Sequence, residues 1–170
     1  MNARHKRRII HSGKLSAAFH EAGHAVTTMH YGGRCSLSME PRHGVDIMEE
    51  SAWDAKCHFR PHALSDEEKA AVSVAGALAQ CLNGIRGENI EWFDDFIENV
   101  EDWQEFMSDT DRAGLSDPDP IAIEEVGRAV FPILIEKWPA VDAVARKFAF
   151  WKSLTDYQVW QAYEKFSRAK

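Results

Sequence analysis

The segment that most constrains this chain is His20-Glu21-Ala22-Gly23-His24, which has the pattern H-E-x-x-H inside an apolar stretch. Residues four apart on an α-helix lie one turn above each other on the same face. His20 and His24 can therefore present two imidazole nitrogens to one metal ion, and such a pair suits tetrahedral zinc. Glu21 lies about 100° around the helix, where its carboxylate could act as the general base of a zinc peptidase without being a ligand.

The residues around this motif predict a helix from about Leu15 to Tyr31, which Gly32-Gly33 would end. Its apolar residues gather on the side opposite the two histidines: Leu15, Ala18, Phe19, Ala22, Ala25, Val26 and Met29. The helix is therefore predicted to have a core face and a separate polar face that carries His20, His24, Thr27 and Tyr31. The alternative interpretation is that both histidines simply lie on a solvated face.

A second helix is predicted from Ser65 to about Leu82. Ser65-Asp66-Glu67-Glu68 has the S-x-x-E pattern of a capping box, and Asn83-Gly84 is typical of a helix end. Residues 70–79 are nearly all small or apolar, which favours a buried helix that packs closely against the first one. The interior of this helix has no acidic residue, so it cannot supply a carboxylate ligand.

Two extended segments are predicted between these helices. Residues 35–40 alternate between apolar and polar side chains, residues 41–44 resemble a turn, and residues 53–59 form the second segment. Together they predict a small antiparallel sheet or hairpin beside the first helix. The neighbours Cys57 and His58 would point to opposite faces of a strand, which argues against a metal-binding pair.

The C-terminal half is predicted to be helical scaffold. Helices are expected over about 121–138, with Pro132 inside, over 139–152, and over 155–168. The expected core stripe of the middle helix is Val141, Val144, Ala145, Phe148 and Trp151. Before them, residues 88–119 hold twelve Asp or Glu against one basic residue, and residues 88–107 have the pattern of an amphipathic helix with a solvated acidic face.

The segment Ala18-Phe19-His20-Glu21-Ala22-Gly23-His24-Ala25-Val26 closely resembles the active-site helix of the FtsH-type ATP-dependent zinc proteases. Val74-Ala75-Gly76-Ala77-Leu78-Ala79 is similar to the small-residue helix that follows in the peptidase domain of that family. The resemblance covers residues 15–150 loosely. It implies a mainly α (α+β), zincin-like peptidase domain, in which an edge strand holds the substrate backbone in extended form. Residues 88–107 would then be an acidic insertion that shapes or covers the cleft.

A catalytic zinc site needs a third protein ligand and leaves a fourth position for water. In the FtsH-type family this ligand is an aspartate at the start of a later helix, and the matching region here is residues 107–114. We expect Asp111 to be the third ligand, because the Ser108-x-x-Asp111 spacing places it at the start of the next element. Asp109 is the rival candidate, and either aspartate could instead simply cap a turn.

Composition and charge limit the number of domains and the kinds of partner that this chain can have. A chain of 170 residues predicts one domain over 15–170 after a basic, flexible tail at 1–14. The net charge of −7 argues against broad nucleic-acid binding, although the basic tail could contact nucleic acid or an acidic partner. The three cysteines form no C-x-x-C pair, which indicates reduced thiols in the cytoplasm. No apolar run reaches the length of a transmembrane helix, so no membrane partner is expected.

These features predict a zinc metallopeptidase that hydrolyses peptide bonds, with Zn2+ held by His20, His24 and Asp111. Without the ATPase module of the FtsH-type family, its expected substrates are peptides or unfolded protein segments, with or without a separate delivery partner. Two alternatives remain. One is a zinc-binding regulatory module without proteolytic activity, and the other is a regulatory protease that cuts a single partner.

Overall fold

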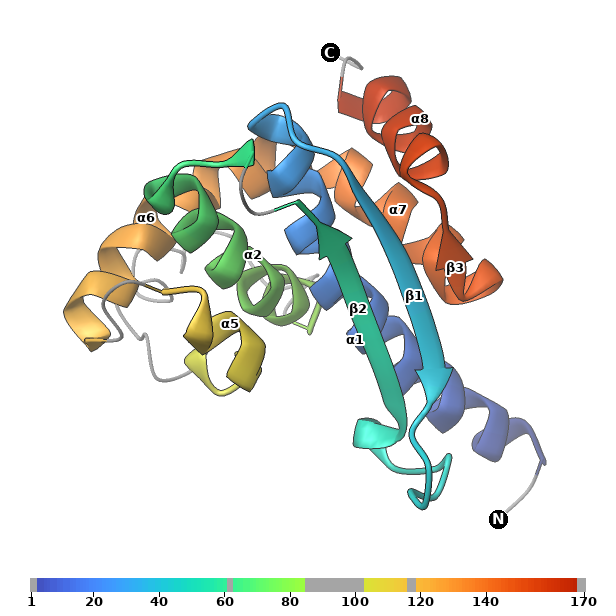
Figure 1. Ribbon diagram of the computed structural model, residues 1–170. Helices are drawn as coiled ribbons and strands as arrows, with labels where there is room; N and C mark the ends of the chain where they lie inside the picture. Colours follow the sequence, from blue (N-terminus) through green and yellow to red (C-terminus); the bar gives the residue numbers. More distant parts are fainter. Residues whose placement is uncertain (1–2, 61–62, 85–102, 116–118, 168–170) are drawn as a thin grey trace.

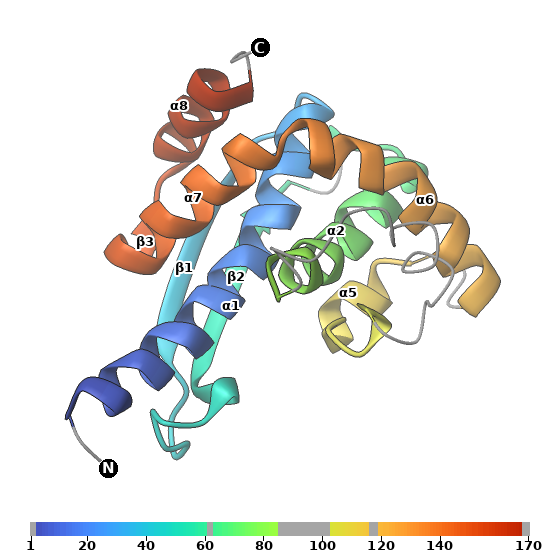
Figure 2. The same ribbon diagram turned by 180° about the vertical axis from the view of Figure 1, so that it is seen from behind.

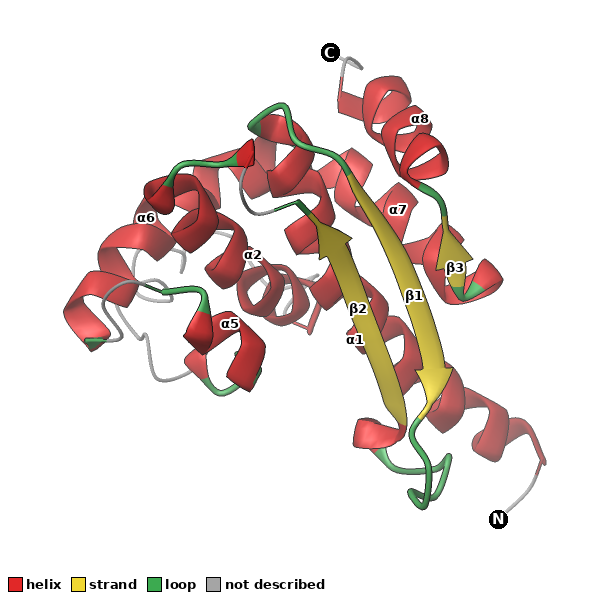
Figure 3. Ribbon diagram, in the orientation of Figure 1, coloured by secondary structure: helices red, strands yellow, loops and turns green. Residues whose placement is uncertain are grey.

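The computed structural model describes residues 3–60, 63–84, 103–115 and 119–167 (Figure 1). Its elements, in chain order, are α1 (Ala3–His30), β1 (Cys35–Pro41), the 3-10 turn η1 (Glu50–Ala52), β2 (Trp53–Phe59), α2 (Asp66–Gly84), α5 (Asp109–Ala113), α6 (Pro120–Glu136), α7 (Trp138–Trp151), β3 (Ser153–Leu154) and α8 (Asp156–Ser167). The described part is mainly helical with one small antiparallel sheet (Figure 3). This confirms the predicted fold class, whereas the zincin-like fold stays a prediction.

Helix α1 is the element against which the others pack. It contacts α2, α7 and both long strands, and the view from behind shows it lying between the sheet and α7 (Figure 2). Its predicted core residues are buried except Leu15, which is half-buried, but His20, His24 and Thr27 on the polar side are buried as well. The interpretation of a solvated histidine face is therefore wrong, because α2 and β2 cover that side of the helix.

Helix α1 begins at Ala3, earlier than the predicted start at Leu15. No proline interrupts residues 3–14, and the arginines, lysines and isoleucines there are compatible with a helix. The basic segment that we predicted to precede the helix therefore continues it. The C-terminal end is close to the prediction, since α1 stops at His30 and Gly32 takes a positive φ of 79°.

The predicted hairpin is confirmed, and it is part of a larger sheet. Strands β1 and β2 pair antiparallel, from Cys35 opposite Phe59 to Pro41 opposite Trp53. Strand β3, which the sequence did not predict, pairs with the other side of β1 and gives the order β2-β1-β3. It has only two residues, too few for an alternating pattern. Strand β2 is consequently at an edge of the sheet.

Helices α1 and α2 approach each other closely. The capping box of α2 is present, with the Ser65 amide donating to Glu68 Oε2 at 2.8 Å and the Glu68 amide donating to Ser65 Oγ at 3.2 Å. A Cβ built on Gly23 of α1 would overlap the carbonyl oxygen of Ala75 and lie 2.7 Å from Ala79 Cβ. The small residues of α2 thus let the two backbones meet, as their composition predicted.

The C-terminal helices α6, α7 and α8 lie within two residues of their predicted bounds. The prediction that Trp151 belongs to the core is wrong, because its side chain is 64% exposed. Trp151 is the last residue of α7, and Lys152 turns the chain away in a left-handed conformation with φ 62°. Tyr157 of α8 is likewise exposed.

Residues 85–102 lie outside the described residues, and with them most of the predicted acidic helix at 88–107. Its described end contributes Trp103 and Met107 to the core. Among the helices of the described ranges, none has the length and apolar character needed to span a bilayer. Cys35, Cys57 and Cys81 form no disulfide within these ranges.

Candidate metal centre

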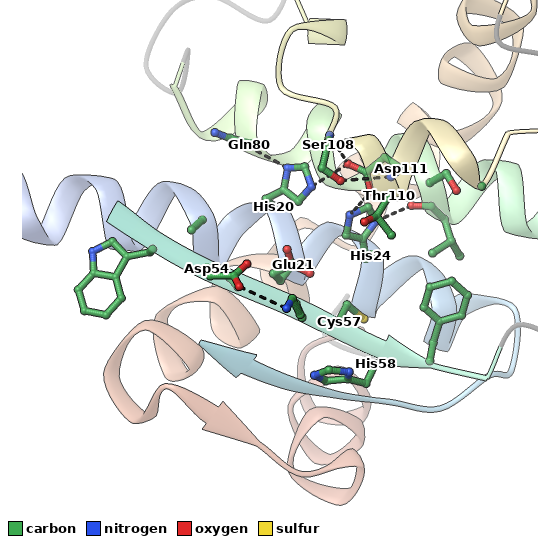
Figure 4. A pocket seen from close by; sticks show the side chains of 18 of the residues that line it. His20, Glu21, His24, Asp54, Cys57, His58, Gln80, Ser108, Thr110 and Asp111 are labelled. Carbon is green, nitrogen blue, oxygen red and sulfur yellow. Dashed lines mark hydrogen bonds and ion pairs between the residues drawn. The ribbon is translucent and has the colours of Figure 1, made fainter. Parts of the chain in front are cut away.

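Three side chains of α1 converge on a buried point beside α2 and β2 (Figure 4). The coordinating atoms of His20, Glu21 and His24 all lie within 4.8 Å of one another, and each residue is at most 8% exposed. The spacing of the two histidines on one helix face produces this arrangement, as the sequence predicted. The group could therefore bind a metal ion.

Asp111 completes the group from a distant part of the chain. Its Oδ2 lies 3.1 Å from His20 Nε2, and its Oδ1 lies 3.1 Å from His24 Nε2. Asp111 is buried, whereas Asp109 on the same short helix is exposed. Of the two aspartates considered from the sequence, the structure thus brings Asp111 to the histidines.

The capping box of α5 fixes the Asp111 carboxylate. Ser108 is the N-cap residue, and its Oγ accepts a hydrogen bond from the Asp111 amide at 3.2 Å. In return, the Ser108 amide donates to Asp111 Oδ2 at 2.7 Å. The Ser-x-x-Asp spacing read from the sequence therefore serves as a cap and also orients a carboxylate towards α1.

Gly76 of α2 leaves open the space between the two histidines. A Cβ built on Gly76 would overlap His24 Nε2 and lie 2.8 Å from His20 Nε2. Only a residue without a side chain can occupy this place while both ring nitrogens stay accessible. The glycine therefore opens a small cradle that is lined by the metal-binding nitrogens.

The donor atoms fit a zinc ion. Zinc bonds of about 2.0–2.2 Å in a tetrahedron place neighbouring ligand atoms about 3.3–3.6 Å apart, somewhat more than the 3.1 Å between each histidine nitrogen and its own oxygen of Asp111. Two imidazoles and one carboxylate are a known ligand set of catalytic zinc, with the fourth position open. The residues present thus suit zinc in both chemistry and spacing.

The remaining ring nitrogens are held by α2. His24 Nδ1 donates to the backbone carbonyl of Val72 at 2.6 Å, and His20 Nδ1 lies 2.9 Å from Gln80 Oε1. The Gln80 amide nitrogen in turn donates to Ser16 Oγ at 3.0 Å, which orients its oxygen towards His20. These contacts leave both Nε2 atoms directed at Asp111, as ligands of a metal ion require.

The sequence analysis did not identify these orienting partners. A signal for Gln80 was available, because it is the one long polar side chain in the small and apolar run from Ala70 to Leu82. The contact from Val72 could not be found in this way, since it uses a backbone carbonyl that any residue would supply.

The charges of the cluster are strongly coupled. Burial by itself would lower the pKa of His24, but the hydrogen bond and negative charge of Asp111, with the charge of Glu21, raise it to about 9. Burial would raise the pKa of Asp111, but hydrogen bonds from His20 and His24 hold it well below its usual range. In the metal-free protein, an ionised Asp111 therefore faces a protonated His24.

The cluster lies in a cleft of about 700 Å3 between α1, β2, α2 and α5. Strand β2 forms one wall, and its free edge runs beside the histidines (Figure 4). Cys57 and His58 of this strand both border the cleft, but Cys57 is half-buried, whereas His58 is exposed and its Nε2 lies 2.8 Å from Ser38 Oγ. The two neighbours thus do not form a metal pair.

Comparison with known proteins adds no identification. No protein-family model matches the chain, and no curated protein matches its sequence. The resemblance to the FtsH-type proteases therefore stays a prediction that rests on the motif residues.

Proposed function

We propose that this protein is a zinc-dependent metallopeptidase that hydrolyses peptide bonds in flexible peptide segments. The observation that carries the proposal is the placement of Asp111 against both His20 and His24, with 3.1 Å between each pair of atoms. A helix motif could arise by chance, but a buried carboxylate from a separate helix that contacts both histidines is the expected arrangement of a ligand set.

His20, His24 and Asp111 would hold the ion. When bound, zinc would activate a water molecule for attack and polarise the scissile carbonyl group. Val72 and Gln80 would keep the imidazole rings in the required tautomer and orientation, because each accepts a hydrogen bond from an Nδ1 atom.

Glu21 would transfer a proton from the attacking water to the leaving amine. Its carboxylate lies beside the histidines, and within the described part of the chain it has no hydrogen bond or ion pair. It is therefore free to accept a proton from the attacking water and to donate it to the nitrogen of the leaving amine. Hydrolysis would consume one water and give a carboxylate and an amine.

Strand β2 would position the substrate. An edge strand offers unpaired backbone groups, which favour pairing with an extended peptide. This edge lines the cleft that contains Glu21. The arrangement favours extended, unfolded segments over folded proteins as substrates, with or without a partner that delivers them.

The proposal is tested by hydrolysis of a mixed library of unstructured peptides with the zinc-loaded protein. Glu21→Gln should retain zinc and lose hydrolysis, since an amide cannot accept the proton. Glu67→Gln, an exposed change in the first turn of α2, is the matched control and should leave both unchanged. Hydrolysis that persists at full rate in Glu21→Gln would contradict the proposed role.

A further inference from the structure

The two ends of the cleft differ in charge. Beyond His24, the lining is formed by uncharged residues such as Phe59, Thr110 and Gly114. At the other end the lining includes Trp53 and Arg42, whose amide donates to the carbonyl of Ala52 beside Trp53. A peptide in the cleft would therefore meet a different environment at each end.

Two lysines add to the positive charge at Trp53. Lys14 Nζ lies 5.3 Å from the centre of the Trp53 ring, and Lys152 Nζ lies 5.6 Å from it. Lys14 comes from α1 and directly follows Gly13, which lines the cleft. Lys152 comes from the corner between α7 and β3. Both ribbon views place this corner and the N-terminal half of α1 at the side of the molecule away from α5 and α6 (Figures 1 and 2).

These cations have no acidic partner within the described ranges. Neither Lys14, Lys152 nor Arg42 forms an ion pair with a described carboxylate. The nearby Asp54 is already bound to Lys56 Nζ at 3.2 Å. Burial and the charge of Lys152 lower the pKa of Lys14, so the two ammonium groups repel each other.

The Trp53 ring itself offers no donor to a peptide, because its indole N–H is buried. The positive character of this end therefore comes from Lys14, Lys152 and Arg42, whose charge an anionic group would offset.

The distance from this end to the metal centre is set by regular structure. Lys14 and Glu21 are seven residues apart on α1, which corresponds to about 10 Å along the axis. Trp53 and Cys57 are four residues apart on β2, which corresponds to about 13 Å. An extended peptide advances about 3.3 Å per residue, so this separation spans three or four substrate residues.

We propose that the cleft selects acidic peptide segments, in which an Asp or Glu lies three or four residues from the bond that faces Glu21 and binds at Lys14 and Lys152, the two lysines beside Trp53. The inference rests on the proposed function for the position of that bond. The preference for acidic peptides itself is a matter of binding and can be measured without hydrolysis.

The test measures binding to the zinc-loaded Glu21→Gln protein by fluorescence anisotropy. Three fluorescein-labelled peptides of equal length share a central leucine among alanines, glutamines and serines. The first is neutral, the second has two aspartates three and four positions before the leucine, and the third has them after it. Because the lysines lie at one end of the cleft, only one of the two acidic peptides can place its aspartates there. That peptide should bind at least about 5-fold more tightly than the neutral one, and added salt should reduce this preference.

Lys14→Gln and Lys152→Asn should each reduce the preference by about 2- to 5-fold, and the double variant should abolish it. Asparagine suits position 152 because it tolerates the left-handed backbone found there, at φ 62°. Lys165→Gln is the matched control, since this exposed lysine of α8 also lies over an aromatic ring, that of Phe166, but does not line the cleft. It should leave the preference unchanged.

Equal affinity for all three peptides would overturn the inference, as would a preference that survives in the double variant. Lys14→Glu gives an independent test, because it should favour a peptide with lysines in place of the aspartates. If acidic peptides bind preferentially but the wild type hydrolyses no peptide, the proposed function alone fails. If peptides are hydrolysed without an acidic preference, only the inference about substrate class fails.

Discussion

Asp111 Oδ2 lies 3.1 Å from His20 Nε2, although 91 positions of the chain separate the two residues. The same carboxylate reaches His24 through its other oxygen. The short helix α5 is held by its Ser108 cap, so the cap, the carboxylate and the two histidines form one connected unit. Each part of this unit can be changed separately by a single substitution.

Asp111→Ala should weaken zinc binding by more than about 100-fold, because it removes a ligand. Loss of a residue that only orients a ligand already lowers metal affinity by about 10- to 100-fold. Zinc affinity is measured by competition with a coloured chelator. Asp109→Ala is the matched control, since Asp109 is on the same helix but exposed. If Asp109→Ala weakened zinc binding and Asp111→Ala did not, our choice of the third ligand would be wrong.

Gly76→Ala should abolish zinc binding while the protein remains helical by circular dichroism. The new methyl group would overlap His24 Nε2 and would fill the space between the two rings. Gly84→Ala adds the same atom to the same helix at a place with no atom within 4 Å, so it should bind zinc normally. Normal zinc binding by Gly76→Ala would show that the ion lies elsewhere.

Gln80→Leu should reduce zinc affinity by about 10- to 100-fold, because His20 Nδ1 would lose its acceptor and the ring its fixed orientation. Gln80→Glu keeps an oxygen in the same place and should retain most of the affinity. The pair is compared by chelator competition, with thermal unfolding as a check on the fold. Equal losses in both variants would indicate a packing effect instead of ring orientation.

The chelated, metal-free protein should lose stability as the pH rises from about 6.5 to 9. Folding raises the pKa of His24 from 6.5 to about 9. The ion pair between protonated His24 and Asp111 therefore stabilises the protein fully below about pH 6.5, and this contribution is lost as His24 deprotonates towards about pH 9. The expected contribution is about 3 kcal/mol. It is measured by urea unfolding at about pH 6 and pH 10.

Asp111→Asn is the control for the pH dependence, since it removes the negative charge that raises the pKa of His24. The difference in unfolding free energy between the two pH values should then shrink, while the effects of all other titrating groups remain. An unchanged difference would show that the stability change comes from another part of the protein.

Much of this arrangement was predictable from local patterns in the sequence. The H-E-x-x-H spacing places His20, Glu21 and His24 correctly because helix periodicity is a local property. The Ser-x-x-Asp spacing likewise indicated the helix that carries Asp111. The capping box of α2 and the two long strands also follow from short patterns, and all of these elements are found where they were expected.

The rest depends on contacts between distant segments. The role of Gln80 appears only when α2 packs against α1, and β3 exists only because α7 ends beside β1. The exposure of Trp151 arises in the same way, since its helix ends before any neighbour covers it. A pattern along one segment carries no information about which other segment will lie beside it.

Elemental analysis of protein purified without added metal shows directly whether this chain holds one zinc ion. We expect about one zinc per chain in the wild type and in Glu21→Gln, and none in His24→Ala. Such a result would leave hydrolysis of the peptide library to separate the proposed peptidase from a regulatory module, whereas a co-purifying partner cut at one bond would indicate a protease with a single partner. No zinc in the wild type, even after zinc is offered, would contradict the account and reduce H-E-x-x-H to a coincidence of sequence.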